Sequence, residues 1–180
     1  GFGYPIYLHE RYPFNTKWPN VPTDYNPVGT YRKIIRLTDE FLTQNIILHF
    51  AGAKSAMYLY VNGNYVGYSQ GSKTPAEFNI TKYLTKGNNL IALQMFRWSD
   101  ASYLESQDML RMSGIERDVY LYAQPEVFIS EYYATTTLDK SYKNGVFNAT
   151  VFISNTSDES ITRLISVEIL VAKNSIYTSS

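Results

Sequence analysis

The stretch Ser55–Gln70, SAMYLYVNGNYVGYSQ, carries the strongest local signal for secondary structure in the chain. Alternating side chains flank Asn62-Gly63, a dipeptide that accepts positive φ at both central positions of a tight turn. The pattern therefore predicts a β-hairpin in which Met57–Val61 pairs with Tyr65–Ser69.

Further strands are predicted on both sides of this hairpin. Asn45–Phe50 is typical of a buried strand, and Leu90–Phe96 and Val119–Ala123 are strand candidates downstream. The longest helical candidate is a single turn near Ile80–Leu84. Short strands at close spacing, without a long helix, indicate an all-β fold of the sandwich type.

Residues 1–30 are predicted to form an irregular arm. Four of its prolines fall within a short span: Pro13, Pro19, Pro22 and Pro27. Proline lacks an N–H and biases the preceding residue toward extended geometry, so this segment is at most an edge strand. Such an arm needs a surface to lie on, and we expect Trp18 and Tyr25 to anchor it.

The character of the sequence changes around Pro125. Beyond it, Asn144-Gly145 signals a second hairpin, and the flanking segments alternate as in the first strands of an immunoglobulin-like sandwich. Such a domain takes about 100 residues, more than remain. We therefore expect one domain over residues 1–126 and an incomplete one over residues 127–180, in a chain cut from something longer.

Composition argues against several classes of function. Basic and acidic residues number 16 each and no basic run stands out, so we expect no nucleic-acid partner. No apolar run approaches the roughly 18 residues of a membrane span. The chain has no cysteine, which is compatible with either the cytoplasm or the periplasm, and its two histidines are too few for a usual zinc site.

Aromatic residues are unusually abundant. They make up 16% of the chain and include 17 tyrosines. Aromatic side chains favour strands, and their flat rings also stack on sugars, so composition leaves both interpretations open.

The stretch Arg97–Val119, RWSDASYLESQDMLRMSGIERDV, is crowded with charge. Its carboxylates Asp100, Glu105 and Asp108 are candidates for the paired acids of glycoside hydrolysis, although nothing in their spacing indicates a pair. The alternative is a network of ion pairs that holds a long loop in place. Asp100 differs because it lies beside Trp98 where a strand ends. It could bind sugar hydroxyls or a hard cation, but one carboxylate is too few for a metal cage.

Three motifs resemble, in order, the sugar-binding domain of β-galactosidases of glycoside hydrolase family 2. They are PTDYNPVGTYRK, VNGNYVGYSQGSKTPAEFNIT and RWSDASYLESQDMLRMSGIERDVYL, and the sequence after them resembles the start of that family's immunoglobulin-like domain. The resemblance implies a jelly-roll, galactose-binding-like β-sandwich followed by a partial immunoglobulin-like sandwich. It further implies the N-terminal piece of a retaining enzyme that hydrolyses terminal β-D-galactosides with two glutamates of an (α/β)₈ barrel.

The same resemblance assigns roles to two residues. Asn26 matches an asparagine that contacts the galactosyl unit, and Asp100 matches an aspartate near the sugar hydroxyls that also helps to hold a sodium ion. The other sodium ligands and both catalytic glutamates would lie in the barrel, so we expect no catalytic residue here and no activity from this piece alone. For the full enzyme the family implies sodium and magnesium as metal ions and a β-galactoside or galactose as ligand. It implies the remaining domains of the same chain as partners, and it leaves open whether the full enzyme is a homo-oligomer.

Two residues depart from the family pattern. Ala101 stands where glycine is common, and Leu110 stands where tryptophan is frequent, which leaves the preference for the leaving group open. Two alternatives also remain. The chain could be a piece of a related β-glucuronidase or β-mannosidase, or a non-catalytic carbohydrate-binding module.

Overall fold

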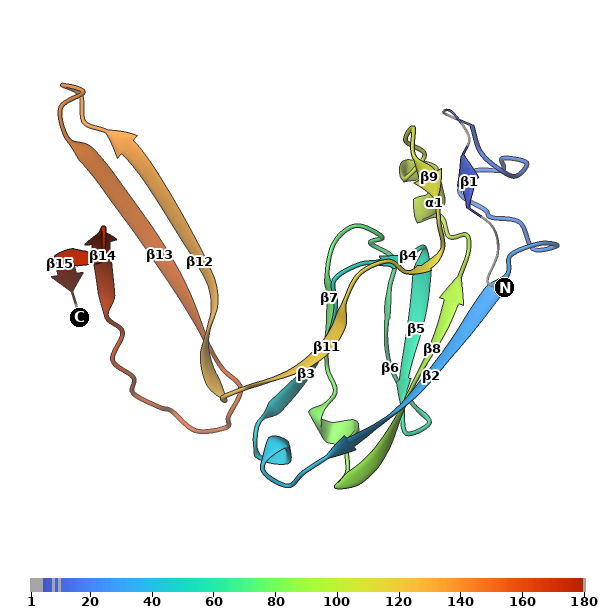
Figure 1. The fold of residues 1–180 in the computed structure, drawn as a ribbon, viewed down its shortest axis with the longest axis horizontal. Helices are drawn as coiled ribbons and strands as arrows, with labels where there is room; N and C mark the ends of the chain where they lie inside the picture. The colour runs from blue at the N-terminus through green and yellow to red at the C-terminus, as the bar shows by residue number, and fades with distance from the viewer. Residues whose placement is uncertain (1–4, 8, 10, 180) are drawn as a thin grey trace. The chain divides into compact units, whose positions relative to one another are not determined.

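The computed structural model describes residues 5–7, 9 and 11–179 (Figure 1). The chain divides into two compact units between Gln124 and Pro125. No helix among the described residues is long and apolar enough to cross a membrane. The candidate site residues lie in the first unit.

Two antiparallel sheets form the first unit. One has the strand order β2-β8-β5-β6, with β2 (Val28–Leu37), β8 (Gly87–Phe96), β5 (Ala56–Val61) and β6 (Asn64–Ser69). The other has the order β11-β3-β7, with β11 (Val119–Gln124), β3 (Asn45–Phe50) and β7 (Ala76–Asn79). Two pairs of short strands complete the unit: β1 (Ile6–Tyr7) pairs with β9 (Leu110–Arg111), and β4 (Ala53–Lys54) pairs with β10 (Gly114–Ile115). Its helical elements are the 3₁₀ turns η1 (Phe41–Thr43) and η2 (Thr81–Tyr83) and the single α-helical turn α1 (Ala101–Leu104).

The hydrophobic core joins the two sheets. Successive side chains of a strand point to opposite faces, so every second residue can enter the core. The buried cluster draws on both sheets and contains Ile46, Leu48, Phe50, Ala53, Met57, Leu59, Val61, Ile80, Leu93 and Met95. The predicted all-β sandwich is therefore confirmed.

The hairpin that the sequence predicts is present. Val61 pairs with Asn64 across the turn, and Asn62 and Gly63 have φ angles of 50° and 82°. Both central residues thus adopt the left-handed conformation that Asn-Gly accepts at low cost. The predicted strand over Asn45–Phe50 is confirmed, and the predicted turn near Ile80–Leu84 is the 3₁₀ turn η2. The longest helical element among the described residues is instead α1, which the sequence did not predict.

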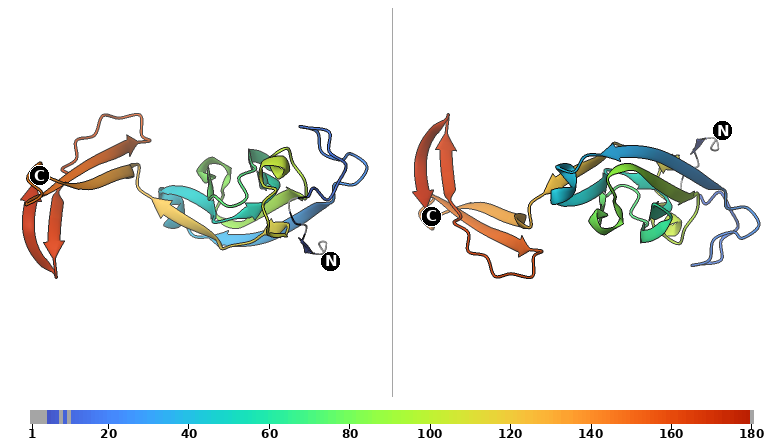
Figure 2. Two further views of the ribbon diagram at one scale, coloured as in Figure 1. Left: turned by 90° about the horizontal axis from the view of Figure 1, so that it is seen from above. Right: turned by 90° about the horizontal axis from the view of Figure 1, so that it is seen from below.

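The N-terminal arm packs on the ring of Tyr103, a buried residue of α1. Figure 2 shows the arm as an irregular loop that leads into β2. The ring centroid of Tyr103 lies 5.1 Å from that of Tyr12, and 5.6 Å from those of Phe14 and Trp18. Trp18, predicted to anchor the arm, makes this ring contact but is itself 66% exposed, so the prediction holds only for the contact. Tyr25 is 68% exposed and makes no ring contact with a described residue, so the half-buried rings of Tyr12 and Phe14 are the stronger anchors.

The second unit consists of two hairpins. Strand β12 (Val127–Leu138) pairs with β13 (Gly145–Asn155), and β14 (Val167–Val171) pairs with β15 (Asn174–Ser179). The second predicted hairpin is thus present, but its turn lies upstream of Asn144-Gly145, with positive φ at Tyr142. The carboxylate of Asp139 organises this wider turn, because it accepts hydrogen bonds from Ser141 and from the side chain of Asn144. The same bonds lower the pKa of Asp139 to about 2.

The hydroxyl of Tyr103 ties the arm down and provides a test of this packing. It donates to the carbonyl of Asn20 at 2.6 Å and accepts from the backbone N–H of Lys17 at 3.0 Å. Tyr103→Phe keeps the ring but removes both bonds, so we expect a loss of about 1–3 kcal/mol in arm stability and faster tryptic cleavage after Lys17. Tyr120→Phe, on the other sheet, is the control. Equal cleavage rates in the two variants would show that the hydroxyl does not hold the arm.

Candidate functional site

Asp100 lies just after β8, where the chain leaves the sheet. Pairing between β2 and β8 ends at Val28 and Phe96, and the next N–H, of Arg97, donates to the carbonyl of Pro27 at 3.0 Å. Asp100 then caps α1, because its Oδ1 accepts from the N–H of Ala101 at 2.9 Å. This bond fixes the carboxylate, while the side chain stays exposed to ligands.

A layer of buried serines supports the loop that carries Asp100. The hydroxyls of Ser55 and Ser99 lie 2.6 Å apart, and the N–H of Ser99 donates to the hydroxyl of Ser102 at 3.0 Å. All three side chains are buried. Because these hydroxyls have protein partners, the serine layer holds the loop backbone and leaves ligand contacts to the residues above it.

The side chain of Asn26 binds the same loop from the arm. Its Nδ2 donates to the carbonyl of Trp98 at 3.0 Å, and its Oδ1 accepts from the N–H of Trp98 at 2.9 Å. The amide therefore pairs with one backbone residue as a neighbouring strand would. An asparagine amide carries a second N–H and a second lone pair, so Asn26 keeps capacity for one ligand group.

One pocket brings the two predicted residues together. It has a volume of about 290 Å³ and is lined by Val21, Asn26, Ala56, Tyr58, Tyr68, Phe96, Trp98, Ser99 and Asp100. Its size is near the lower limit of ordinary ligand sites, which suits a single sugar unit. The polar groups come from the arm and the loop, and the aromatic groups come mainly from the sheet.

The aromatic wall of the pocket is a packed set of rings. The ring centroid of Tyr58 lies 4.9 Å from that of Tyr68 and 5.6 Å from that of Phe96. Burial raises the pKa of Tyr68, and Tyr58 and the negative charge of Asp100 raise it further. The phenol of Tyr68 is therefore neutral near pH 7 and within electrostatic reach of Asp100.

A larger open hollow of about 1910 Å³ lies beneath the arm. Its lining runs from Pro13 to Tyr25 along the arm and includes Tyr31, Trp98 and Asp100. Asp100 thus borders both spaces, whereas Asn26 borders the small pocket. The carboxylate can be approached from the sheet side and from the arm side.

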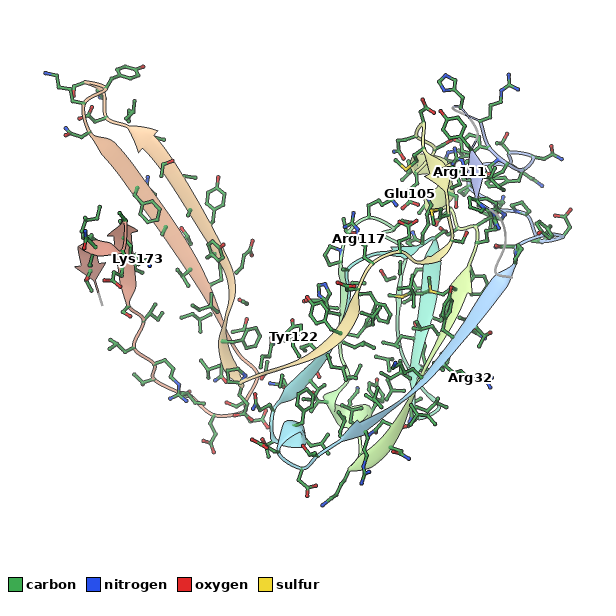
Figure 3. All side chains as sticks on the ribbon, in the orientation of Figure 1. Arg32, Glu105, Arg111, Arg117, Tyr122 and Lys173 are labelled. Carbon is green, nitrogen blue, oxygen red and sulfur yellow. The ribbon has the colours of Figure 1, made fainter. Side chains whose placement is uncertain are left out.

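Ion pairs hold the charged loop only in part, since Glu116 pairs with Lys73 but other charged residues have different partners. Both carboxylate oxygens of Glu105 accept from Ser72, at 3.1 Å from the N–H and 2.6 Å from the hydroxyl. Arg111, which lies beside Glu105 in Figure 3, donates to the carbonyls of Glu105 and Arg11 and to the hydroxyl of Ser106. The prediction of a network of ion pairs is therefore wrong for Glu105 and Arg111, whose partners are backbone groups and hydroxyls.

Asp108, the third carboxylate candidate, lies on the outer part of this loop. It accepts a hydrogen bond from the hydroxyl of Tyr7 and lies 3.2 Å from the Nδ1 of His9. Neither Glu105 nor Asp108 lines the pocket that holds Asp100. The structure therefore does not bring the three carboxylates together as catalytic acids.

The two departures from the family pattern lie outside the pocket lining. Ala101 is half-buried at the first position of α1, and Leu110 lies in β9, 53% exposed and opposite Tyr7. The exposed side chain of Leu110 keeps this part of the loop surface apolar, but it covers a smaller area than a tryptophan side chain would.

Sequence reasoning did not identify Tyr58 and Tyr68 as pocket residues. Alternation in β5 does place Tyr58 and Tyr60 on one face. Tyr65 and Tyr68 are three residues apart, so strict alternation would place them on opposite faces. A bulge between Leu59 and Tyr60 shifts the register, so that Tyr60 faces Tyr65 while Tyr58 faces Tyr68.

The donor set fits a hard cation only in part. Oδ1 of Asp100 is occupied by Ala101, and no described residue donates to its Oδ2. The described residues contain no group of three or more His, Cys, Asp and Glu side chains that could hold a metal. Asp100 could therefore contribute one oxygen ligand to an ion whose other ligands come from outside these residues.

Comparison with known proteins places these observations in a family. The model of the glycosyl hydrolases family 2 sugar binding domain matches residues 1–125. A β-galactosidase of Priestia megaterium is 45% identical over 159 residues, which cover 86% of this chain and 15% of that protein. A β-galactosidase of Vibrio cholerae is 49% identical over 144 residues, which cover 80% of this chain and 14% of that protein.

A solved structure supports the fold independently. A β-glucuronidase from an uncultured Clostridium species has a TM-score of 0.66 and 18% identity, over 90% of this chain and 30% of that one. The chain spans only 14–15% of the length of the two curated relatives. It belongs to glycoside hydrolase family 2, through the sugar-binding domain of that family.

Proposed function

We propose that the chain forms the galactose-binding wall of a retaining β-galactosidase whose catalytic carboxylates lie outside these residues. The observation that carries the proposal is that Asn26 and Asp100, from separate segments, line one pocket of sugar size. The identity of 45% and 49% to two β-galactosidases supports the choice of enzyme.

The chemistry of the pocket suits binding and not bond cleavage. Asp100 is the one carboxylate among the residues that line it. A retaining glycosidase needs two carboxyl groups about 5 Å apart, one as nucleophile and one as acid and base. Asp100 would accept hydrogen bonds from sugar hydroxyls, and Asn26 would offer its remaining N–H or lone pair. The domain then positions the sugar while another part of the enzyme cleaves it.

Asp100 is the one residue of this chain that we propose as a metal ligand. The free Oδ2 of Asp100 would be one sodium ligand, and the barrel would supply the others. A bound sodium ion would add positive charge that orients hydroxyl oxygens near the carboxylate. Magnesium, which the family also implies for the full enzyme, has no assigned ligand in this chain.

The second unit, Pro125–Ser180, is proposed to be the incomplete immunoglobulin-like domain expected over residues 127–180. One face of its β12–β13 ribbon carries Ile129, Tyr132, Leu138, Phe147 and Ile153, all exposed. A two-stranded ribbon is marginally stable without a partner for its apolar face. Further strands of the same polypeptide would cover it. The remaining domains, a homo-oligomer of the full enzyme and a cytoplasmic or periplasmic location stay open.

Two alternatives are less well supported. A β-glucuronidase or β-mannosidase piece would share the fold, but a β-glucuronidase of Bacteroides uniformis is 28% identical, against 45% and 49% for the two β-galactosidases. A free-standing carbohydrate-binding module would leave the apolar ribbon of the second unit uncovered. Hydrolysis of p-nitrophenyl galactoside, glucuronide and mannoside by the full-length enzyme separates the candidates.

Asp100→Asn tests the role of the carboxylate. Asparagine is also a good N-cap, so the loop should keep its shape while the charge is lost. In the full-length enzyme we expect kcat/KM for a galactoside to fall about 100-fold or more and the response to sodium to disappear. Asp108→Asn, in the same loop but outside the pocket, should leave both unchanged. Wild-type kinetics in Asp100→Asn would contradict the assignment.

Asn26→Ala tests a residue with two tasks. It leaves the N–H and carbonyl of Trp98 without partners, so we expect a loss of about 1–3 kcal/mol in unfolding free energy together with weaker galactose binding. Thermal unfolding and the inhibition constant of galactose measure the two effects. Asn15→Ala, at an exposed position of the arm, is the control. A variant that loses stability but binds galactose normally would reduce Asn26 to a structural role.

A further inference from the structure

The outer face of the four-stranded sheet carries a row of tyrosines beside the pocket. Tyr58 faces Tyr68 across β5 and β6, and Tyr60 faces Tyr65. The ring of Tyr58 lies within 6.2 Å of the rings of both Tyr65 and Tyr68. Bulges re-aim side chains and are over-represented next to active sites, and this one brings both tyrosines of β6 to the same side.

Tyr68 is the exposed member of this row that lines the same pocket as Asp100. Its side chain is 41% exposed, it lines the same pocket as Asp100, and its hydroxyl donates to the Oε1 of Gln70. Tyr65 is 52% exposed but does not line the pocket. The ring of Tyr68 is therefore held between Tyr58 and Gln70, with part of its surface available to a ligand.

An aromatic wall opposite a carboxylate matches the two sides of a pyranose. The edge of the ring carries hydroxyls, and its face carries C–H groups that pack on aromatic surfaces. In galactose the axial hydroxyl leaves one face with a continuous apolar patch, whereas the equatorial hydroxyl of glucose reduces that patch. Aromatic contacts of this kind are worth about 0.5–1.5 kcal/mol beyond their buried area.

We propose that the ring of Tyr68, backed by Tyr58, is the stacking surface for the sugar whose hydroxyls Asn26 and Asp100 bind, and that it helps the pocket to select galactose over glucose. The inference rests on the proposed function, since it concerns the same pocket. It adds a specificity-determining residue from β6 to a site otherwise built from the arm and the loop.

The test compares three variants of the full-length enzyme on p-nitrophenyl β-galactoside and β-glucoside. Tyr68→Ala should raise KM for the galactoside roughly tenfold, change kcat by less than about threefold, and lower the preference for galactoside over glucoside. Tyr68→Phe keeps the ring but loses the hydroxyl bond to Gln70, so its rise in KM should be smaller than that of Tyr68→Ala. Tyr65→Ala removes a similarly exposed ring of the same strand outside the pocket and should also behave as wild type.

Three outcomes would overturn the inference. The first is an unchanged KM in Tyr68→Ala, and the second is an unchanged preference for galactoside over glucoside in the same variant. The third is an equal effect in Tyr65→Ala, which would mean that the whole face packs on another part of the protein. If Tyr68→Ala does not fold, the galactose dissociation constant of Tyr68→Leu, which keeps the bulk without the flat ring, decides in the same way.

Failure of this inference can be told from failure of the proposed function. A wild-type enzyme that does not hydrolyse galactosides, or an Asp100→Asn variant with normal kinetics, removes the proposed function whatever Tyr68 does. A galactosidase that loses activity in Asp100→Asn but is indifferent to Tyr68→Ala keeps the proposed function and rejects the stacking role.

Discussion

The two hydrogen bonds between the amide of Asn26 and the backbone of Trp98 join the arm to the loop, and the position of Asp100 depends on them. Without them, the polar groups of Trp98 would be unpaired in a half-buried environment, which costs free energy. The arm would also lose a fixed point close to the pocket. The rings around Tyr103 hold the arm from the other side, so arm and loop stabilise each other. The site is a junction of two irregular segments on a rigid sheet.

The sheet contributes rigidity and also chemistry. Its inner face packs the core through residues such as Leu59 and Leu93, and its outer face presents aromatic rings next to the carboxylate. Below the loop, the hydroxyl of Ser102 accepts from the N–H of Ser99, so this backbone group does not compete for ligands. Preorganisation of this kind matters for binding, since groups that are already fixed lose little entropy when a ligand arrives.

The sequence predicts the local structure well because local chemistry decides it. The two residues Asn62-Gly63 are enough to determine a turn, and alternation of apolar and polar side chains over five or six residues is enough to indicate a strand. Contacts between distant segments are less accessible: Asn26 and Trp98 lie 72 positions apart, and nothing in either motif indicates that one amide pairs with that backbone. The family resemblance pointed to Asn26 and Asp100 but not to their shared pocket. The ion-pair prediction failed for Glu105 because N–H groups and hydroxyls satisfy a carboxylate as well as cations do.

The position of β11 at the end of the first unit bears on how the protein is made. β3 pairs with β7 on one side and with β11 on the other, so its sheet stays incomplete until residues 119–124 have left the ribosome. All the residues that line the small pocket lie between Val21 and Asp100, earlier in the chain. Domains generally fold as units during synthesis, beginning at the N-terminus. The residues of the pocket thus leave the ribosome before β11 does, and the first unit can fold as a whole once β11 has followed.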